Sequence, residues 1–370
     1  MYRTTWMEVN LDKIADNVRK CREICGKRII AVLKADAYGC GDSHVAKAVL
    51  EAGASMIAVS SVDEALMLRN EGYDGEVLIL GMTDPEDVPL LVENRISTAA
   101  YSPEWAEAVS AKNCRGLKVH MKVDTGMSRI GFRTNESLKE GFLKLKEAGC
   151  SMDGIFTHFC CADTDMEMTD RQYKRFRSAV EYLDYPFEWI HCDNSDATVF
   201  FKDPISNACR LGISLYGIST YEKSLEYPIS LYSTVMMTKH VSKGETIGYG
   251  ATYTAEGDEI IATVPIGYAD GLVRANQGRK VYIDGMLCEI TGRVCMDQVM
   301  IRLDHDVPFG TPVEIFGPHI SIEKMAEELH TIPYEIICLI SGRVTRTYIW
   351  HGEKVTEENA RLLKSEATEL

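Results

Sequence analysis

The first 230 residues alternate short apolar runs with amphipathic helical stretches, and this alternation restricts the fold more than any other feature. Alternating strands and helices joined by short links are typical of a parallel sheet. Eight such units fit into this length, which predicts a (β/α)8 barrel. An open doubly wound sheet is the alternative, but it usually has fewer strands, and no Gly-x-Gly-x-x-Gly motif follows the first one. The strands are expected at Ile29–Leu33, Met56–Val59, Glu76–Leu80, Ile96–Ala99, Val119–Val123, Gly154–Phe156, Trp189–Cys192 and Ala208–Leu211.

After about Ser230 the pattern changes to short strands broken by glycine-bearing turns, which is typical of an all-β module. One helix is expected to begin near Ser321, whose hydroxyl suits an N-cap, and a second to cover Pro333–Ile340. A strand at Arg346–Trp350 is expected to close the ordered part, and the charged tail from Glu353 is expected to fray.

The length of 370 residues allows two domains that share an interface. The change of pattern predicts an N-terminal barrel over residues 1–230 and a C-terminal mainly-β domain over residues 231–370. Whether about the first ten residues pair with the second domain stays open.

The composition argues against several classes of partner. The formal net charge is −15, from 55 acidic and 40 basic residues, and a surface this acidic repels nucleic-acid phosphates and anionic lipids. The twelve cysteines form no Cys-x-x-Cys pair, so neither a zinc site nor a thioredoxin-type motif is indicated. The first 13 residues lack the apolar stretch of a signal peptide, and no run approaches the roughly 20 apolar residues that span a bilayer. We therefore expect a cytoplasmic enzyme without a metal site.

Polar side chains gather at the carboxyl ends of the predicted barrel strands. In a (β/α)8 barrel the loops after these ends converge on one mouth, where the chemistry takes place. The ends that carry such residues are those with Lys34; with Lys122, Asp124 and Arg129; with His158; with His191, Asn194 and Ser195; and with Arg210 and Gly212. A lysine that directly follows an apolar strand is rarely placed there without a function. The sequence therefore predicts an active site at this mouth.

Several segments resemble the motifs of the alanine racemase family, which are fold-type III enzymes that depend on pyridoxal phosphate. Ala31–Gly39, with the sequence AVLKADAYG, resembles the family's cofactor-lysine signature. The other matching segments follow in the family's order: Asp124–Gly131, Phe156–Phe159, Asn194–Ser195, Arg210–Ile213, Tyr249–Tyr253, Gly267–Gly271 and Cys295–Gln298. The resemblance spans nearly the whole chain and implies a barrel followed by a C-terminal β domain.

The resemblance implies that Lys34 holds pyridoxal 5′-phosphate as a Schiff base and acts as one catalytic base. Tyr249 resembles the second base. Two bases on opposite faces of the cofactor can remove a proton from one face of the α-carbon and deliver one to the other. Both free side chains titrate near pH 10, so each pKa must be shifted toward working pH. In the family this tyrosine enters from the partner subunit, which implies a homodimer with shared active sites.

Arg210 resembles the arginine that hydrogen-bonds the pyridine nitrogen of the cofactor, and His158 resembles the histidine that hydrogen-bonds this arginine. Because arginine stays protonated, it should keep that nitrogen neutral. The ring is then a poorer electron sink, which suppresses transamination.

The remaining implied contacts concern the cofactor phosphate and the substrate. The residues that match the family's phosphate contacts are Tyr38, Ser195, the backbone N–H groups of Gly212 and Ile213, and Tyr334. Arg129 resembles the arginine that orients the phenolic oxygen of the cofactor and approaches the substrate carboxylate. Met296 resembles the residue whose backbone N–H meets that carboxylate from the partner subunit, and Tyr268 lies at the family's entrance. Lys122 matches a position that is carbamylated in many members.

Two departures bear on subfamily more than on reaction: Cys40 stands where many members have histidine, and Ser128 where many have glycine. The implied activity is interconversion of L- and D-alanine, which supplies D-alanine for a bacterial cell wall. Racemisation of serine or of a broader set of amino acids is the alternative, because pockets reject an added hydroxyl weakly. A fold-type III decarboxylase would pair the pyridine nitrogen with an acid, which Arg210 opposes. A pyridoxal-phosphate carrier would end after the barrel.

Overall fold

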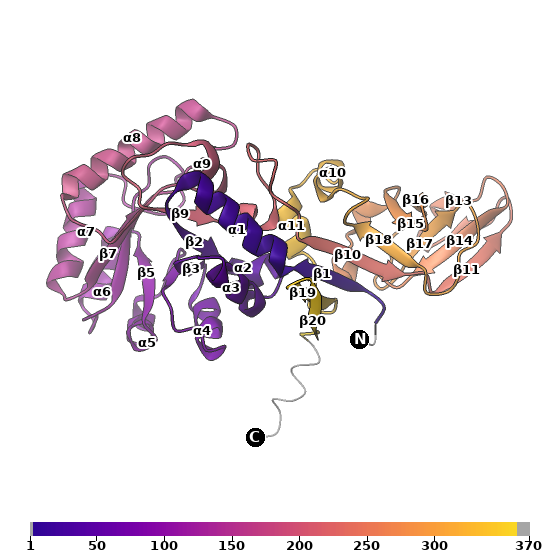
Figure 1. The fold of residues 1–370 in the computed structure, drawn as a ribbon, viewed down its shortest axis with the longest axis horizontal. Helices are drawn as coiled ribbons and strands as arrows, with labels where there is room; N and C mark the ends of the chain where they lie inside the picture. The colour runs from indigo at the N-terminus through magenta and orange to yellow at the C-terminus, as the bar shows by residue number, and fades with distance from the viewer. Residues whose placement is uncertain (1–2, 361–370) are drawn as a thin grey trace, which may run out of the picture. The chain divides into compact units, whose positions relative to one another are not determined.

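A computed structural model describes residues 3–360 of the chain (Figure 1). The chain divides into two compact units. The barrel unit comprises Lys13–Ala37 and Asp42–Tyr227, and the β unit comprises Met1–Asp12, Tyr38–Gly41 and Pro228–Leu370, as far as these ranges are described. Among the described residues, no helix combines the length and the apolar character needed to cross a membrane.

Eight parallel strands form the barrel, in the order β8-β7-β6-β5-β4-β3-β2-β9. Backbone hydrogen bonds from Asn207 N to Ile190 O (2.9 Å) and from Arg210 N to Asp193 O (3.0 Å) join the two ends of this order. The predicted barrel is therefore confirmed, and the open doubly wound sheet is excluded. The strands are β2 (Arg28–Val32), β3 (Met56–Val59), β4 (Val77–Ile79), β5 (Ile96–Ala100), β6 (Lys118–Lys122), β7 (Ser151–Phe156), β8 (Trp189–His191) and β9 (Ala208–Leu211).

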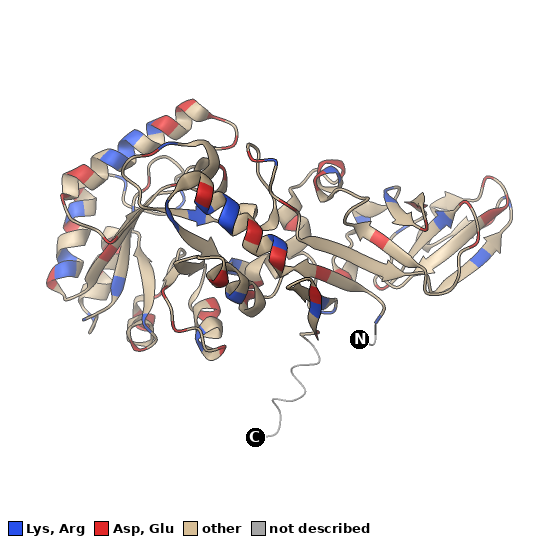
Figure 2. Cartoon of the chain, viewed as in Figure 1, with Lys and Arg blue, Asp and Glu red and all other residues tan. Residues whose placement is uncertain are grey.

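Helices alternate with these strands along the chain (Figure 1). They are α1 (Leu11–Cys25), α2 (Lys34–Gly39), α3 (Asp42–Glu51), α4 (Val62–Asn70), α5 (Val88–Glu93), α6 (Pro103–Ser110), α7 (Asn135–Glu147), α8 (Met166–Leu183) and α9 (Ser195–Phe200), with 3-10 turns η1 (Pro85–Asp87) and η2 (Ile213–Tyr216). Ser61, Ser102, Thr134 and Asp165 cap α4, α6, α7 and α8, each accepting a hydrogen bond from a backbone N–H three residues on. Acidic and basic residues are interspersed along α1, α7 and α8 (Figure 2), as expected for helices with one face in solvent.

Alternate residues of a strand point to opposite faces, so each barrel strand sends every second side chain inward. Ile30 and Val32 of β2 pack with Met56 and Ala58 of β3 and with Leu78 of β4 in one buried cluster. Nearer the carboxyl ends of β6, β8 and β9, inward positions carry polar residues instead, namely His120, Lys122, His191 and Arg210, and these build the candidate site.

A ten-stranded sheet dominates the β unit, in the order β11-β14-β17-β16-β15-β18-β10-β1-β19-β20. The first strand, β1 (Trp6–Asn10), pairs antiparallel with β10 and parallel with β19, so residues 6–10 lie in this sheet. The other strands are β10 (Ile229–Thr234), β11 (Met237–Val241), β14 (Glu259–Val264), β15 (Lys280–Ile283), β16 (Met286–Ile290), β17 (Val299–Leu303), β18 (Pro312–Phe316), β19 (Thr345–Trp350) and β20 (Glu353–Glu358). A separate pair is formed by β12 (Thr246–Ile247) and β13 (Tyr253–Thr254).

The helices of the β unit are α10 (Ile322–Glu328) and α11 (Pro333–Cys338), with 3-10 turns η3 (Tyr249–Ala251), η4 (Tyr268–Asp270) and η5 (Arg274–Asn276). Ser321 caps α10 as predicted, accepting a hydrogen bond from Lys324 N at 3.3 Å. The predicted fraying from Glu353 is wrong for the described part of the tail, because β20 pairs antiparallel with β19. Backbone pairing at a sheet edge needs no apolar side chains, and charged side chains are common on edge strands. Residues 361–370 of the predicted tail lie outside the described residues.

Candidate active site

Lys34 begins α2, separated from the end of the first barrel strand, β2, by Leu33 alone. The next four residues, Ala35 to Tyr38, all have φ between 50° and 59°, so this turn is left-handed. A left-handed turn costs about 1–2 kcal/mol per residue and must be held by contacts from elsewhere. Glu64 Oε1 accepts a hydrogen bond from Ala35 N at 2.7 Å, and the Tyr216 hydroxyl donates one to Ala37 O at 2.7 Å. The turn therefore fixes the backbone that follows Lys34.

Arg210 lies at the end of β9, where it is almost completely buried, and both of its Nη atoms are fully engaged. Nη1 donates to His191 Nδ1 (3.0 Å) and to His191 O (2.9 Å). Nη2 donates to His158 Nδ1 (3.0 Å), Thr157 O (2.7 Å) and Cys192 O (3.1 Å). Burial lowers the pKa of Arg210 to about 10, which still leaves it a cation at neutral pH. Among the described residues, no hydrogen-bond acceptor meets its Nε–H, so this donor is left for a ligand.

The contacts of Arg210 determine which ring nitrogen of His191 carries its proton, and this in turn determines how His191 bonds to His120. Arginine can only donate, so His191 Nδ1 accepts and the proton of His191 must sit on Nε2. His191 Nε2 lies 3.0 Å from His120 Nδ1 and therefore donates to it. The result is a buried chain of hydrogen bonds in which Arg210 donates to His191 and His191 donates to His120. Sequence reasoning missed His120, although it stands two residues before Lys122 on β6, and a spacing of two places both on the same face.

Lys122 is buried at the end of β6, where its Nζ donates to Val123 O at 2.9 Å. Burial, reinforced by the positive charges of Arg210 and Arg129, lowers its pKa to about 7, although Asp124 opposes this shift. A substantial fraction of the Lys122 side chain is therefore an uncharged, nucleophilic amine near neutral pH.

The loop after β6 presents Arg129 at the surface of the unit. Asp124 Oδ1 organises this loop by accepting hydrogen bonds from Gly126 N (3.1 Å) and Ser128 N (2.9 Å). Ser128 has φ 57°, a left-handed backbone conformation that glycine adopts more readily than serine. His158 also belongs to this neighbourhood, because burial and the charges of Arg210, Arg129, Lys122 and Lys34 lower its pKa well below 6.5.

Ser195 begins α9 and links it to the turn after β9. Its Oγ accepts hydrogen bonds from Gly212 N (3.0 Å) and Ser214 N (3.3 Å). The resemblance implies that the Gly212 N–H contacts the cofactor phosphate, but in this structure it donates to Ser195 Oγ. Ile213 lies between the two donors at the start of η2. The predicted phosphate residues of the barrel unit are therefore neighbours.

The remaining predicted residues lie in the β unit, in two groups. Tyr38 is buried, and burial together with Cys338 and Tyr334 raises its pKa, so Tyr334 of α11 is its neighbour. Tyr249, Tyr268 and Met296 form the second group and expose 71%, 41% and 52% of their surface, so none of the three is buried within one chain.

Two backbone hydrogen bonds, from Tyr268 N to Cys295 O and from Ala269 N to Met296 O (both 3.0 Å), join the Gly267–Gly271 and Cys295–Gln298 motifs. A Cβ at Gly267 would lie 2.4 Å from the carbonyl oxygens of Cys295 and Met296, so this close approach requires glycine. Sequence reasoning gave no role to Asp270, which is fully buried and pairs with Arg3 and Arg343. Asp270 also accepts a hydrogen bond from Gly267 N at 3.0 Å, so it holds the motif that carries Tyr268.

The buried histidines predict a loss of stability in acid. Burial lowers the pKa of His120 to about 3, and burial with the charge of Arg210 lowers that of His191 well below 6.5. Below pH 6.5 the unfolded chain binds protons that the folded chain excludes, so stability falls as pH falls. Each histidine contributes about 1.4 kcal/mol per pH unit in this window. Urea unfolding between pH 6.5 and 5 should show this slope, and His120→Gln should reduce it. The exposed His240 gives a control, since an equal reduction in His240→Gln would contradict this assignment.

Comparisons with known proteins give a consistent result. The family model described as alanine racemase, N-terminal domain, matches residues 9–220, and that described as alanine racemase, C-terminal domain, matches residues 228–348. Alanine racemase of Anoxybacillus flavithermus is 42% identical over 98% of this chain and 99% of its own length. The crystal structure of alanine racemase from Bacillus anthracis with bound L-Ala-P superposes with a TM-score of 0.94 at 38% identity, covering 98% of this chain and 99% of that one. Histidine racemase from Leuconostoc mesenteroides superposes with a TM-score of 0.86 at 30% identity, covering 94% and 99% of the two chains.

Proposed function

Because this chain belongs to the alanine racemase family, we propose that it interconverts L- and D-alanine with pyridoxal 5′-phosphate as its cofactor. The observation that carries the proposal is Arg210, a buried cation whose two Nη atoms are saturated while its Nε–H is left for a ligand. A pyridine nitrogen accepts one hydrogen bond, so it fits this single donor. The exposed amine of Lys34 and the Ser195–Gly212–Ile213 turn fit the other two ends of the cofactor, its aldehyde and its phosphate.

The chemistry that pyridoxal phosphate supplies when bound is withdrawal of electrons from the α-carbon of the substrate. Arg210 limits this withdrawal, because an arginine that stays protonated does not give its proton to the pyridine nitrogen. A weak electron sink restricts proton delivery to the substrate's own α-carbon, which favours racemisation over transamination. His158 and His191 position Arg210 by accepting from its two Nη atoms.

Lys34 and Tyr249 are proposed to move the protons. The Lys34 amine holds the cofactor covalently and exchanges protons at one face of the α-carbon, and the Tyr249 hydroxyl does so at the opposite face. Arg129 and the backbone N–H of Met296 are proposed to hold the substrate carboxylate, with Tyr268 at the entrance. Tyr38 and Tyr334 are proposed to complete the phosphate site.

A homodimer with shared active sites is proposed as the working form. Lys34 belongs to the barrel unit, whereas Tyr249, Tyr268 and Met296 belong to the β unit and are strongly exposed within one chain. Exposed aromatic and methionine side chains that a motif holds in place are typical of an interface. We propose that a second copy of the chain covers them and that the C-terminal domain, starting near residue 231, thereby completes the partner's site.

Lys122 is proposed to carry a carbamate, which would place an anion between the cations Arg129 and Arg210. Carbamylation requires the neutral amine, so the pKa of about 7 predicts more carbamate as pH rises from 6 to 8. Protein in ¹³C-bicarbonate should show a carbamate carbonyl resonance in ¹³C NMR that Lys122→Met lacks. A wild-type spectrum without this resonance at pH 8 would overturn the proposal.

The identity of the amino acid is tested by a chiral assay of the purified holoenzyme with L-alanine, L-serine and L-histidine. We expect L-alanine to have the highest kcat/KM. Serine is the nearest competitor, since one added hydroxyl changes binding by only about 1–3 kcal/mol. Histidine belongs in the panel because a racemase named for it shares this fold at 30% identity. If kcat/KM for serine or histidine equals or exceeds that for alanine, the proposal that alanine is the preferred substrate is wrong. We further propose a cytoplasmic role in supplying D-alanine to peptidoglycan, supported by the bacterial sources of the similar alanine racemases.

A further inference from the structure

Two adjacent cysteines, Cys160 and Cys161, lie in the loop that connects β7 to α8, and we call them the vicinal pair. Their Sγ atoms lie 3.4 Å apart, so the two side chains point to the same side of the loop. Cys160 is exposed and Cys161 is partly exposed, so solvent reaches both thiols. The loops after the carboxyl ends of barrel strands surround the mouth of a barrel. The chain therefore presents two neighbouring thiols on a mouth loop.

The backbone of the vicinal pair is held on both sides. Cys160 N donates to Oε1 of the fully buried Gln172 at 2.9 Å, and Gln172 Nε2 in turn donates to His158 O at 3.1 Å. Cys161 O accepts a hydrogen bond from Asp165 N at 2.8 Å. A pair of groups on a fixed backbone loses less conformational freedom on binding than a pair on a mobile one. The two thiols are therefore preorganised to bind one ligand together.

The spacing of the vicinal pair suits an atom that bridges the two sulfurs better than a direct bond between them. Consecutive Cα atoms are about 3.8 Å apart, whereas cysteines joined by a disulfide usually place theirs about 4.4–6.8 Å apart, so a disulfide here would be strained. One atom that bonds both sulfurs at about 2.3 Å, a length typical of a zinc–thiolate bond, subtends an angle of about 95° at a sulfur separation of 3.4 Å. Trivalent arsenic has bond angles in this range, because its lone pair closes its three bonds below the tetrahedral angle.

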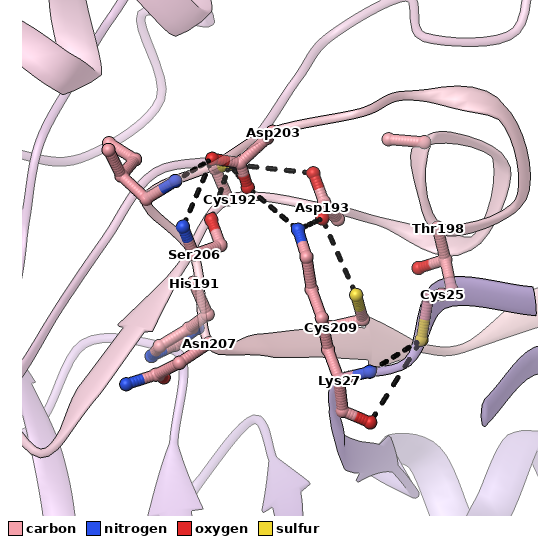
Figure 3. Close-up of polar contacts among 12 residues, drawn as sticks. Cys25, Lys27, His191, Cys192, Asp193, Thr198, Asp203, Ser206, Asn207 and Cys209 are labelled. Atoms are coloured by element: carbon pink, nitrogen blue, oxygen red, sulfur yellow. Dashed lines mark hydrogen bonds and ion pairs between the residues drawn. The ribbon is translucent and has the colours of Figure 1, made fainter. Parts of the chain in front are cut away.

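A structural metal ion fits the vicinal pair less well, because tetrahedral zinc takes four ligands. Among the described residues, the group of three or more side chains spaced to hold a metal is Cys192, Asp193 and Asp203, and it does not include the vicinal pair. In that group the Lys27 ammonium lies 2.9 Å from both carboxylates and already supplies the cation (Figure 3). The vicinal pair therefore suits a ligand that needs two protein sulfurs and no third protein group.

We propose that the vicinal pair is a binding site for trivalent arsenicals of the class R–As(OH)2, which it holds through both sulfurs. Each thiol sulfur forms one S–As bond and displaces one hydroxyl group, which leaves as water with the thiol proton. Two thiols and one arsenical therefore give one cyclic dithioarsenite and two molecules of water, and neither sulfur nor arsenic changes its oxidation state. Burial and the adjacent Cys160 thiol raise the pKa of Cys161 to about 11, so Cys161 reacts from its protonated form. A small dithiol reverses the reaction by exchange.

Peptide mapping with phenylarsine oxide gives the direct test. Cleavage before aspartate releases the vicinal pair in residues 153–162, which contain no other cysteine. The reduced holoenzyme is incubated with an equimolar amount of phenylarsine oxide, its remaining thiols are blocked with iodoacetamide, and the peptides are weighed by mass spectrometry. We expect this peptide to gain one phenylarsenic group in place of two hydrogen atoms and to lose it after treatment with 2,3-dimercaptopropanol. Recovery of the peptide with two blocked thiols, or as a disulfide without arsenic, would overturn the proposal.

Single substitutions test whether both sulfurs take part. The second S–As bond forms within one molecule, so its loss in Cys160→Ser or Cys161→Ser should weaken binding of a fluorescent arsenical by about 10²-fold or more. Cys25→Ser, which removes a partly exposed cysteine from α1, is the matched control and should leave the affinity unchanged. Wild-type affinity in both variants of the vicinal pair would show that the arsenical binds elsewhere.

Discussion

Lys34→Ala is expected to lower racemase activity by about 10⁴-fold or more, because it removes the residue that is proposed both to anchor the cofactor covalently and to act as one of the two bases. General acid–base catalysis alone contributes about 10²–10⁴-fold, and loss of nucleophilic attachment adds to this. Ser195 and Arg210, which are proposed to contact the cofactor phosphate and pyridine nitrogen, lie in other segments and keep their own partners in the variant. Without the covalent bond, these contacts are expected to hold the cofactor only reversibly, so dialysis should remove it from the variant and not from the wild type.

The measurement combines activity with spectroscopy. Wild-type protein should keep its visible absorbance through dialysis, and Lys34→Ala should lose it. Borohydride treatment of the wild type should fix the cofactor permanently to the peptide that contains Lys34. Lys47→Ala is the matched control, an exposed lysine on α3 whose loss should change neither property. A Lys34→Ala protein that stays yellow after dialysis, or cofactor mass at another lysine, would show that the anchor has been misassigned.

The barrel could be predicted from sequence because the alternation of strand and helix is a local property that also fixes the topology. Lys34, Arg210 and the other mouth residues were found for the same reason, since they lie at or just after the ends of apolar strands. The role of His120 could not be predicted, because the local sequence of its strand does not indicate the contact with His191, which lies 71 residues further along the chain. Its recognition needed the three-dimensional pairing of neighbouring strands.

Other features depend on contacts between distant segments. The left-handed turn after Lys34 contradicts the local preference of Ala35 to Tyr38, and contacts from Glu64 and Tyr216 help to hold it. β20 carries no apolar pattern and forms because β19 offers it a free edge. Local periodicity therefore predicts the strands, the helices and their topology. Strained turns and side-chain networks depend on contacts between residues that are distant in sequence, so they could not be predicted in this way.

Tyr249→Phe is expected to lower kcat/KM by about 10²–10⁴-fold, as loss of one general acid–base does. Because the two enantiomers of alanine have equal free energies, kcat/KM must fall equally in both directions. The two enantiomers should differ instead in the rate at which the α-hydrogen exchanges with deuterium from deuterium oxide. This rate should fall far more for L-alanine than for D-alanine, because Lys34, which is proposed to remove the proton of D-alanine, is still present. Tyr253→Phe, four residues away and hydrogen-bonded to Glu259, is the control and should leave both exchange rates unchanged. Equal exchange rates from both enantiomers in Tyr249→Phe would remove this tyrosine from the mechanism.

The same variant tests where Tyr249 acts. If each site combines Lys34 of one subunit with Tyr249 of its partner, a mixed dimer of Lys34→Ala and Tyr249→Phe chains contains one intact site and one site that lacks both groups. Random association of the two chains should then restore about a quarter of the wild-type activity, because half of the dimers are mixed and each has one working site. If both groups came from the same chain, every site in the mixture would lack one of them. Activity that stays at the level of the separate variants, although mass spectrometry finds mixed dimers, would place Tyr249 in the site of its own chain.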